Sequence, residues 1–358
     1  MLQARTPALW GGAAVSRIEL RAAPHVHAPT SVETIMFNVV LAMLPICFFS
    51  VWQYGVSSAV LILTVTATCL LTERFFSSKS GKGNTLADWS ATITGILLAL
   101  TLPPGFPLWM GAVAGFVAIA LGKVLFGGLG YNPFNPALVG RAFVQAAFPS
   151  AIASFVPAFA PQRFVEFAPS TLTAPLMIPA DNAGWIKAAA VDAFTGATPL
   201  ARWKFENFTY TTHDFLSGAV AASAGETSAL LILLCGTYLA VRRFMDWRIP
   251  VAVLGSAALI AWGLQLYNPA HFPSPLFVVL SGGLMLGAVF MATDMATSPV
   301  TPLGVWIYGA LIGVLTVVIR YFGGLTEGVM YAILIANAAS PLIEKFTQPR
   351  TYGAGGAK

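Results

Sequence analysis

One short polar stretch of this chain holds the residue types best suited to chemistry. It reads Asp-Ala-Phe-Thr-Gly-Ala-Thr-Pro-Leu and lies between long apolar runs. The small residues Gly196 and Ala197 leave the hydroxyl of Thr198 room to accept a bulky group, and Pro199 favours an extended backbone before it. The carboxylate of Asp192 could bind a metal ion or orient a nucleotide donor in a modifying enzyme. The stretch therefore predicts a modifiable hydroxyl at Thr198, with an ordinary surface turn as the alternative.

The rest of the chain is too apolar for a soluble protein. Of its 358 residues, 57% are hydrophobic and 9% are charged, and the mean hydropathy is +0.75. Soluble domains carry about 25% charged residues, so most of this surface must face lipid. The net charge of +5 requires no nucleic-acid partner, because membrane proteins concentrate Lys and Arg on the cytoplasmic side. We predict an all-α protein that crosses a lipid bilayer many times.

The apolar residues fall into ten segments that could lie in a membrane. One of them is short and ends before Pro103 and Pro104, which cannot continue a helix, so we expect a half-helix or a broken helix there. The ten segments are approximately 34–53, 57–75, 88–102, 107–126, 137–160, 218–241, 249–267, 276–293, 303–321 and 327–344.

These segments predict two membrane repeats of five helices each. The string Phe-Gly-Gly-Leu occurs at 126–129 and again at 322–325, and a glycine precedes a threonine by six residues in both 95–101 and 287–293. Chance is the alternative, because glycine and phenylalanine are abundant. Five helices are an odd number, so the two halves must be inverted in the membrane, and such repeats commonly build a site near the midplane.

The domain boundaries and the orientation follow from these repeats. Most basic residues lie on the side of the N-terminus, which we therefore place in the cytoplasm together with the C-terminus. The long loop that carries Thr198 then faces the periplasm of a bacterial inner membrane. The predicted parts are an N-terminal arm (1–33), the first repeat (34–160), the outer loop (161–217), the second repeat (218–344) and a tail (345–358).

Further polar residues stand at the ends of the apolar segments. Asn132 and Asn135 each precede a proline, which favours a helix start with free N–H groups that could bind a polar ligand, or simply a capped helix. Asp294 follows an apolar segment and could line an ion path, with an interfacial cap as the alternative. Glu226 fits the first turn of the helix predicted at 218–241.

Several of these motifs resemble one known family. The string D-x-x-[ST]-G-A-T ending at Thr198 is similar to the acceptor site of a covalently bound flavin, with Thr195 in place of the usual serine. The chain as a whole resembles the NqrB/RnfD family of membrane subunits, and its small N-terminal arm favours the Rnf branch. Other matching strings begin at Gly127, Val289 and Arg320, and the Ala336-Asn337 pair and Pro341-Leu-Ile also match.

The resemblance implies a cofactor and an activity. FMN would be esterified through its phosphate to Thr198, within the attachment motif formed with Asp192, Thr195, Gly196 and Ala197. It also implies a second, non-covalent flavin such as riboflavin in the membrane part, for which Asn132 and Asn135 are candidate residues. The implied activity is electron transfer between ferredoxin and NAD, coupled to Na⁺ or H⁺ transport, on a urea-transporter-like fold.

The chain requires partners for such a reaction. It has no Rossmann glycine fingerprint for NAD and only three cysteines, without the spacing of an iron–sulfur site. We therefore expect it to be a translocase subunit that is inactive alone, assembled with iron–sulfur and flavin subunits and modified by a flavin-attaching transferase. A small-solute channel or transporter is the alternative, and a purely structural membrane anchor is a third.

Overall fold

In the part of the chain that it describes, the structure, a computed structural model, has helices as its only regular secondary structure. The described residues are 31–79, 85–180, 182, 198–206, 208, 210, 212–218, 220–226, 228–269 and 271–349, and none of them forms a strand. The predicted all-α class is therefore confirmed for these residues. Most of the predicted N-terminal arm, 1–30, and the end of the predicted tail, 350–358, lie outside them.

Six of the described helices are long and apolar enough to cross a bilayer. Their outer faces expose large apolar side chains such as Phe48, Leu63 and Leu259, which suits contact with lipid. These helices confirm a multi-pass membrane protein. They are α1 (Val32–Tyr54), α2 (Val56–Lys79), α4 (Leu108–Ala120) with its continuation η2 (Val124–Phe126), α11 (Arg248–Tyr267), α14 (Pro302–Phe322) and α15 (Val329–Thr347).

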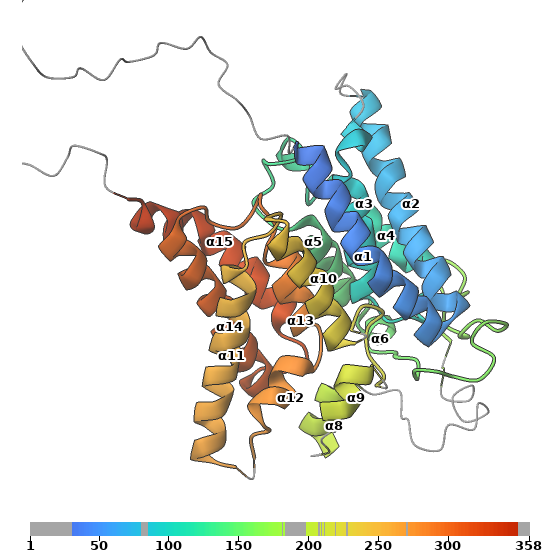
Figure 1. The fold of residues 1–358 in the computed structure, drawn as a ribbon. Helices are drawn as coiled ribbons and strands as arrows, with labels where there is room; N and C mark the ends of the chain where they lie inside the picture. Colours follow the sequence, from blue (N-terminus) through green and yellow to red (C-terminus); the bar gives the residue numbers. More distant parts are fainter. Residues whose placement is uncertain are drawn as a thin grey trace, which may run out of the picture. The chain divides into compact units, whose positions relative to one another are not determined.

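Shorter helices lie between the long ones along the chain (Figure 1). In the first half they are η1 (Thr85–Asp88), α3 (Ser90–Thr101), α5 (Pro136–Ala147) and α6 (Pro149–Ile152). In the second half they are α8 (Pro199–Glu206), α9 (Thr212–Ser217), α10 (Ala229–Val241), α12 (Pro275–Leu280), α13 (Leu284–Leu286) and the π-helical turn η3 (Gly287–Met291). Helix α2 packs against α3 and α4, and α14 packs against α11 and α15.

Helix α3 is the half-helix that the prolines predict. It ends at Thr101, and Leu102 has an extended backbone before Pro103. The carbonyl groups at this end accept hydrogen bonds from a distant part of the chain: Ala224 N–H donates to Leu102 at 3.0 Å and Gly225 N–H to Leu100 at 2.6 Å. A Cβ at Gly225 would lie 2.9 Å from the Leu100 carbonyl oxygen, so this close approach requires glycine.

The second half also contains a broken helix. The sequence predicts one segment over 276–293, but the structure divides it into α12, α13 and η3. Gly282 has a φ of +63°, a backbone conformation that favours glycine and interrupts the helix. The carbonyls of Val278 and Ser281 accept hydrogen bonds from the buried guanidinium of Arg320, at 2.7 and 3.0 Å. A cation therefore satisfies the carbonyl groups that the break leaves unpaired.

Two further predicted segments are shorter than expected. The segment predicted at 218–241 becomes helical only at Ala229, because residues 224 and 225 bind the end of α3 instead. The segment predicted at 137–160 ends as α5 at Ala147, followed by the one-turn helix α6 that begins at Pro149. Proline cannot donate the hydrogen bond that a continuous helix requires.

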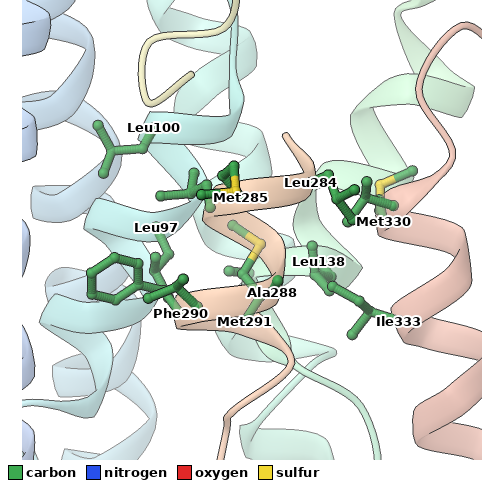
Figure 2. Packing of buried hydrophobic residues seen from close by; sticks show 14 of the residues in the cluster. Leu97, Leu100, Leu138, Leu284, Met285, Ala288, Phe290, Met291, Met330 and Ile333 are labelled. Atoms are coloured by element: carbon green, nitrogen blue, oxygen red, sulfur yellow. The ribbon is translucent and has the colours of Figure 1, made fainter. Parts of the chain in front are cut away.

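The short helices meet in one buried apolar cluster, shown in Figure 2. Close packing, rather than transfer from water, holds helices together in a membrane, so this contact stabilises the broken segments. The labelled side chains come from α3 (Leu97, Leu100), α5 (Leu138), α13 and η3 (Leu284, Met285, Ala288, Phe290, Met291) and α15 (Met330, Ile333).

Substitution of a helix glycine by alanine, which adds one methyl group, tests the packing of α14 against α11. A Cβ at Gly313 would collide with the Ser256 hydroxyl and the Val253 carbonyl oxygen, whereas nothing lies within 4 Å of one at Gly255. We expect Gly313→Ala to destabilise the protein by about 1–3 kcal/mol through overpacking. Gly255→Ala should be neutral or stabilising, because alanine favours helix. Thermal unfolding of the detergent-solubilised protein measures both, and equal effects would contradict this packing.

Candidate cofactor site

Thr198 lies directly before helix α8 and caps it. Its hydroxyl oxygen accepts a hydrogen bond from Ala201 N–H at 3.2 Å, and its carbonyl accepts one from Arg202 N–H at 2.9 Å. Pro199 occupies the first helical position, where its missing N–H costs nothing. The residue is only 2% exposed, so Thr198 is a buried helix cap and not part of the ordinary surface turn that the sequence left as the alternative.

The remaining residues of the predicted attachment motif lie outside the described part of the chain. These are Asp192, Thr195, Gly196 and Ala197. Their predicted roles stay predictions.

Helix α8 is fixed to the second half of the protein through its last turn. The ammonium group of Lys204 donates to the carbonyl oxygens of Arg320, Gly323 and Leu325, at 3.2, 2.5 and 3.2 Å. These carbonyls lie at and beyond the C-terminal end of α14, where helical partners are lacking. The buried ring of Trp203 also packs 5.2 Å from the ring of Tyr321. The position of Thr198 is therefore set by α14.

The two cationic side chains of α8 have shifted pKa values in opposite directions. Hydrogen bonds to Tyr210 and Glu206 raise the pKa of Arg202, since both stabilise its charged form. Partial burial lowers the pKa of Lys204, because desolvation disfavours an ammonium ion.

Thr198 lines a cavity of about 420 Å³. This volume is within the range of about 300–1,000 Å³ that is usual for small-molecule sites. The walls come from α5, α6, α8 and the connection between α14 and α15, so both halves of the protein contribute. They include Arg141, Gln145, Phe155, Phe205 and Glu327.

An ion pair between a buried arginine and a partly buried glutamate contributes polar groups to the wall of this cavity. Arg141 of α5 donates from Nη2 to Oε2 of Glu327 at 2.8 Å, and Arg141 is 6% exposed. Arg141 lies within the apolar segment predicted at 137–160, and nothing in the sequence near either residue identifies Glu327 as its partner. The pair connects the two halves of the protein.

Glu226 lies beside this pair and not in a helix. Its predicted place in a first helical turn is wrong, because α10 begins at Ala229 with Ser228 as its cap. The side chain of Glu226 is buried and lines a second, small cavity of about 30 Å³ with Arg141 and Glu327.

Asn132, Asn135 and Asp294 meet in a third cavity, of about 90 Å³. Asn135 caps α5, with its side-chain oxygen accepting from Ala137 N–H at 3.0 Å, and it also donates to the Met291 carbonyl at 3.2 Å. The capped helix start that the sequence left open is therefore confirmed at Asn135. A flavin contact at this residue stays a prediction.

Asp294 follows η3 and belongs to a turn. One of its carboxylate oxygens accepts from Ala296 N–H at 3.2 Å, which is the capping arrangement that the sequence offered as an alternative. Its role in an ion path stays a prediction.

Comparison with known proteins assigns the chain to a family. The sequence model of the NQR2, RnfD, RnfE family matches residues 19–353. The chain belongs to this family. The predicted resemblance is confirmed over nearly the whole sequence.

Similar proteins come from several bacteria. One is the D subunit of the proton-translocating ferredoxin:NAD(+) oxidoreductase complex of Clostridium ljungdahlii, 36% identical over 93% of this chain and 96% of the relative. Another is the D subunit of the Na(+)-translocating ferredoxin:NAD(+) oxidoreductase complex of Acetobacterium woodii, 37% identical over 94% and 95%. The D subunit of an ion-translocating oxidoreductase complex of Alcanivorax borkumensis is 36% identical over 92% and 95%.

Loss of the Lys204 ammonium group tests how α8 is held. We expect Lys204→Met to destabilise α8 locally by about 1–3 kcal/mol, because the carbonyls at the end of α14 lose a charged donor. Hydrogen–deuterium exchange of peptides that cover α8 measures this loss. Glu206→Gln on the same helix removes only an exposed i,i+4 ion pair and should change exchange little. Unchanged exchange in Lys204→Met would show that these bonds do not fix the helix.

Proposed function

We propose that this chain is the D-type membrane subunit of an ion-translocating ferredoxin:NAD oxidoreductase complex. It carries FMN covalently on Thr198 and passes electrons through that flavin, coupled to Na⁺ or H⁺ transport. The family membership and the complexes to which the relatives belong support this assignment. The chain is a translocase subunit that is inactive without its partners, because electrons must enter and leave through other iron–sulfur and flavin subunits.

The observation that carries this proposal is the place of Thr198 at the wall of a cavity of about 420 Å³. This volume suits a small-molecule ligand. The hydroxyl of Thr198 lies where a flavin attached through its phosphate would enter the cavity.

The position of Thr198 at the start of a helix suits a phosphate ester. The first N–H groups of α8 and its dipole favour negative charge at this end. A phosphodiester on the Thr198 hydroxyl would lie close to those N–H groups, and the ester oxygen can still accept the hydrogen bond from Ala201. When bound, the flavin supplies the redox chemistry, and the protein supplies its position and electrostatic environment.

We further propose that the short helices complete ten membrane segments in two inverted halves of urea-transporter-like fold. The broken helices support this, since α3 in one half and α12 to η3 in the other are both interrupted and both contribute to the same buried cluster. Under this proposal the termini are cytoplasmic and the loop that carries Thr198 is periplasmic, in the bacterial inner membrane. A transferase would then attach the flavin on that side.

A second, non-covalent flavin such as riboflavin is proposed for the cavity that Asn132, Asn135 and Asp294 line. The cavity has apolar walls with a few polar groups, but its volume of about 90 Å³ is below the range of about 300–1,000 Å³ that is usual for small-molecule sites. The proposal therefore requires the cavity to widen when the flavin binds. Asp294 at its edge is the candidate for an ion path.

Two substitutions of Thr198 test the attachment site: Thr198→Val removes the hydroxyl group, and Thr198→Ser removes the methyl group. In cells that contain the transferase, wild-type chain should fluoresce in a denaturing gel under ultraviolet light. Thr198→Val should be dark because no hydroxyl is left to esterify, whereas Thr198→Ser should retain some fluorescence. A dark wild-type band would favour a solute channel or a structural anchor.

Asn132 provides a separate test of the second flavin. Its side chain lines the cavity and bonds only to the nearby Phe134 carbonyl among the described residues, so Asn132→Leu should preserve the fold. We expect at least a several-fold loss of flavin released on denaturation, with the fluorescent covalent band unchanged. Equal release from variant and wild type would place that flavin elsewhere.

A further inference from the structure

Helix α8 contributes one of its faces to the wall of the cavity beside Thr198. Thr198, Ala201 and Phe205 stand at positions i, i+3 and i+7, which lie on one side of an α-helix, and all three line the cavity of about 420 Å³. Leu200 and Trp203 of the same helix are buried and do not line it. The cavity face of α8 therefore runs from the hydroxyl-bearing Thr198 to an aromatic ring.

The aromatic ring at the end of this face is free to receive a ligand. Phe205 is 74% exposed, and among the described residues its ring packs against no other aromatic ring. The neighbouring aromatic residues differ, because the Trp203 ring lies 5.2 Å from that of Tyr321 and the Phe208 ring lies 5.2 Å from that of Tyr210. An aromatic ring that is exposed at a cavity wall can pack against a planar ring of a ligand.

The length of this face matches the length of the FMN side chain. Seven residues of α-helix rise by about 10 Å. In FMN, the phosphate and the ribityl chain separate the esterified oxygen from the ring system, and in extended form they span a similar distance. A flavin that is attached to Thr198 and follows the cavity face of α8 would pass the small side chain of Ala201 and bring its ring system to Phe205.

We infer that the side chain of Phe205 packs against the isoalloxazine ring of FMN and fixes its position along α8. This inference rests on the proposed attachment of FMN at Thr198. The cavity has further apolar lining residues, among them Ile152, Phe155 and Leu325, which suit a largely apolar ring system. Phe205 supplies position, and the flavin supplies the redox chemistry.

A tryptophan at position 205 tests this contact in the full chain, produced with the transferase and reconstituted in lipid nanodiscs. An excited flavin takes an electron from an indole ring in contact with it, and the electron returns without emission. We therefore expect Phe205→Trp to shorten the fluorescence lifetime of the covalent flavin at least several-fold. Phe208→Trp is the matched control and should leave the lifetime unchanged, because Phe208 is also exposed but does not line the cavity. The emission of Thr198→Val is subtracted as the background of non-covalent flavin.

Removal of the aromatic ring provides a second readout. Phe205→Leu keeps an apolar side chain but loses the planar face, so the flavin ring should rotate more freely and the fluorescence anisotropy of the covalent flavin should fall. Phe208→Leu should keep the wild-type anisotropy. The fluorescent band in a denaturing gel should persist in all four phenylalanine variants, because the ester forms at Thr198.

The outcomes separate this inference from the proposed function. A fluorescent covalent band with wild-type lifetime in Phe205→Trp and wild-type anisotropy in Phe205→Leu overturns the contact but leaves the flavin on Thr198, and Phe205 would then face lipid or a partner subunit. Equal shortening of the lifetime in both tryptophan variants also overturns it, because the ring would not be held at the cavity face. A dark wild-type band overturns both proposals. If Phe205→Trp is not produced in folded form, the anisotropy of Phe205→Leu decides the question.

Discussion

The structure depends on the need to satisfy backbone polar groups where helices break within an apolar environment. Lipid offers no hydrogen bonds, so each interrupted helix must find partners inside the protein. The end of α3 is paired by the backbone of Ala224 and Gly225. The end of α12 is paired by the Arg320 guanidinium, and the end of α14 by the Lys204 ammonium group. These hydrogen bonds allow non-helical segments to lie inside the protein without unpaired backbone groups.

The same contacts position the candidate site. Arg320 belongs to the last turn of α14 and binds the end of α12, and Lys204 of α8 binds the carbonyls at the end of α14. The second broken helix and α8 therefore share α14 as their support. Thr198 stands at the other end of α8 and lines the cavity that the Arg141–Glu327 pair also lines. A buried charge pair costs desolvation energy, which makes it weak evidence for stability.

Much of the architecture could be predicted from the sequence, and the site only in part. Composition indicated the membrane class, and Pro103 predicted the end of α3 because proline has no N–H to donate. The attachment motif and the family landmarks single out Thr198 as the modified residue, which stays a prediction. The partnership of Arg141 with Glu327 could not be found, because 186 residues separate them and nothing local marks Glu327. The helix start at Ala229 was missed for a similar reason, since distant carbonyls of α3 hold the chain before it.

A density map of the native complex tests the central claim most directly. We predict flavin density that is continuous with the Thr198 hydroxyl through a phosphate and that enters the cavity lined by Arg141 and Glu327. An unmodified Thr198 whose cavity contains only water, in material from a host that attaches flavins, would contradict it.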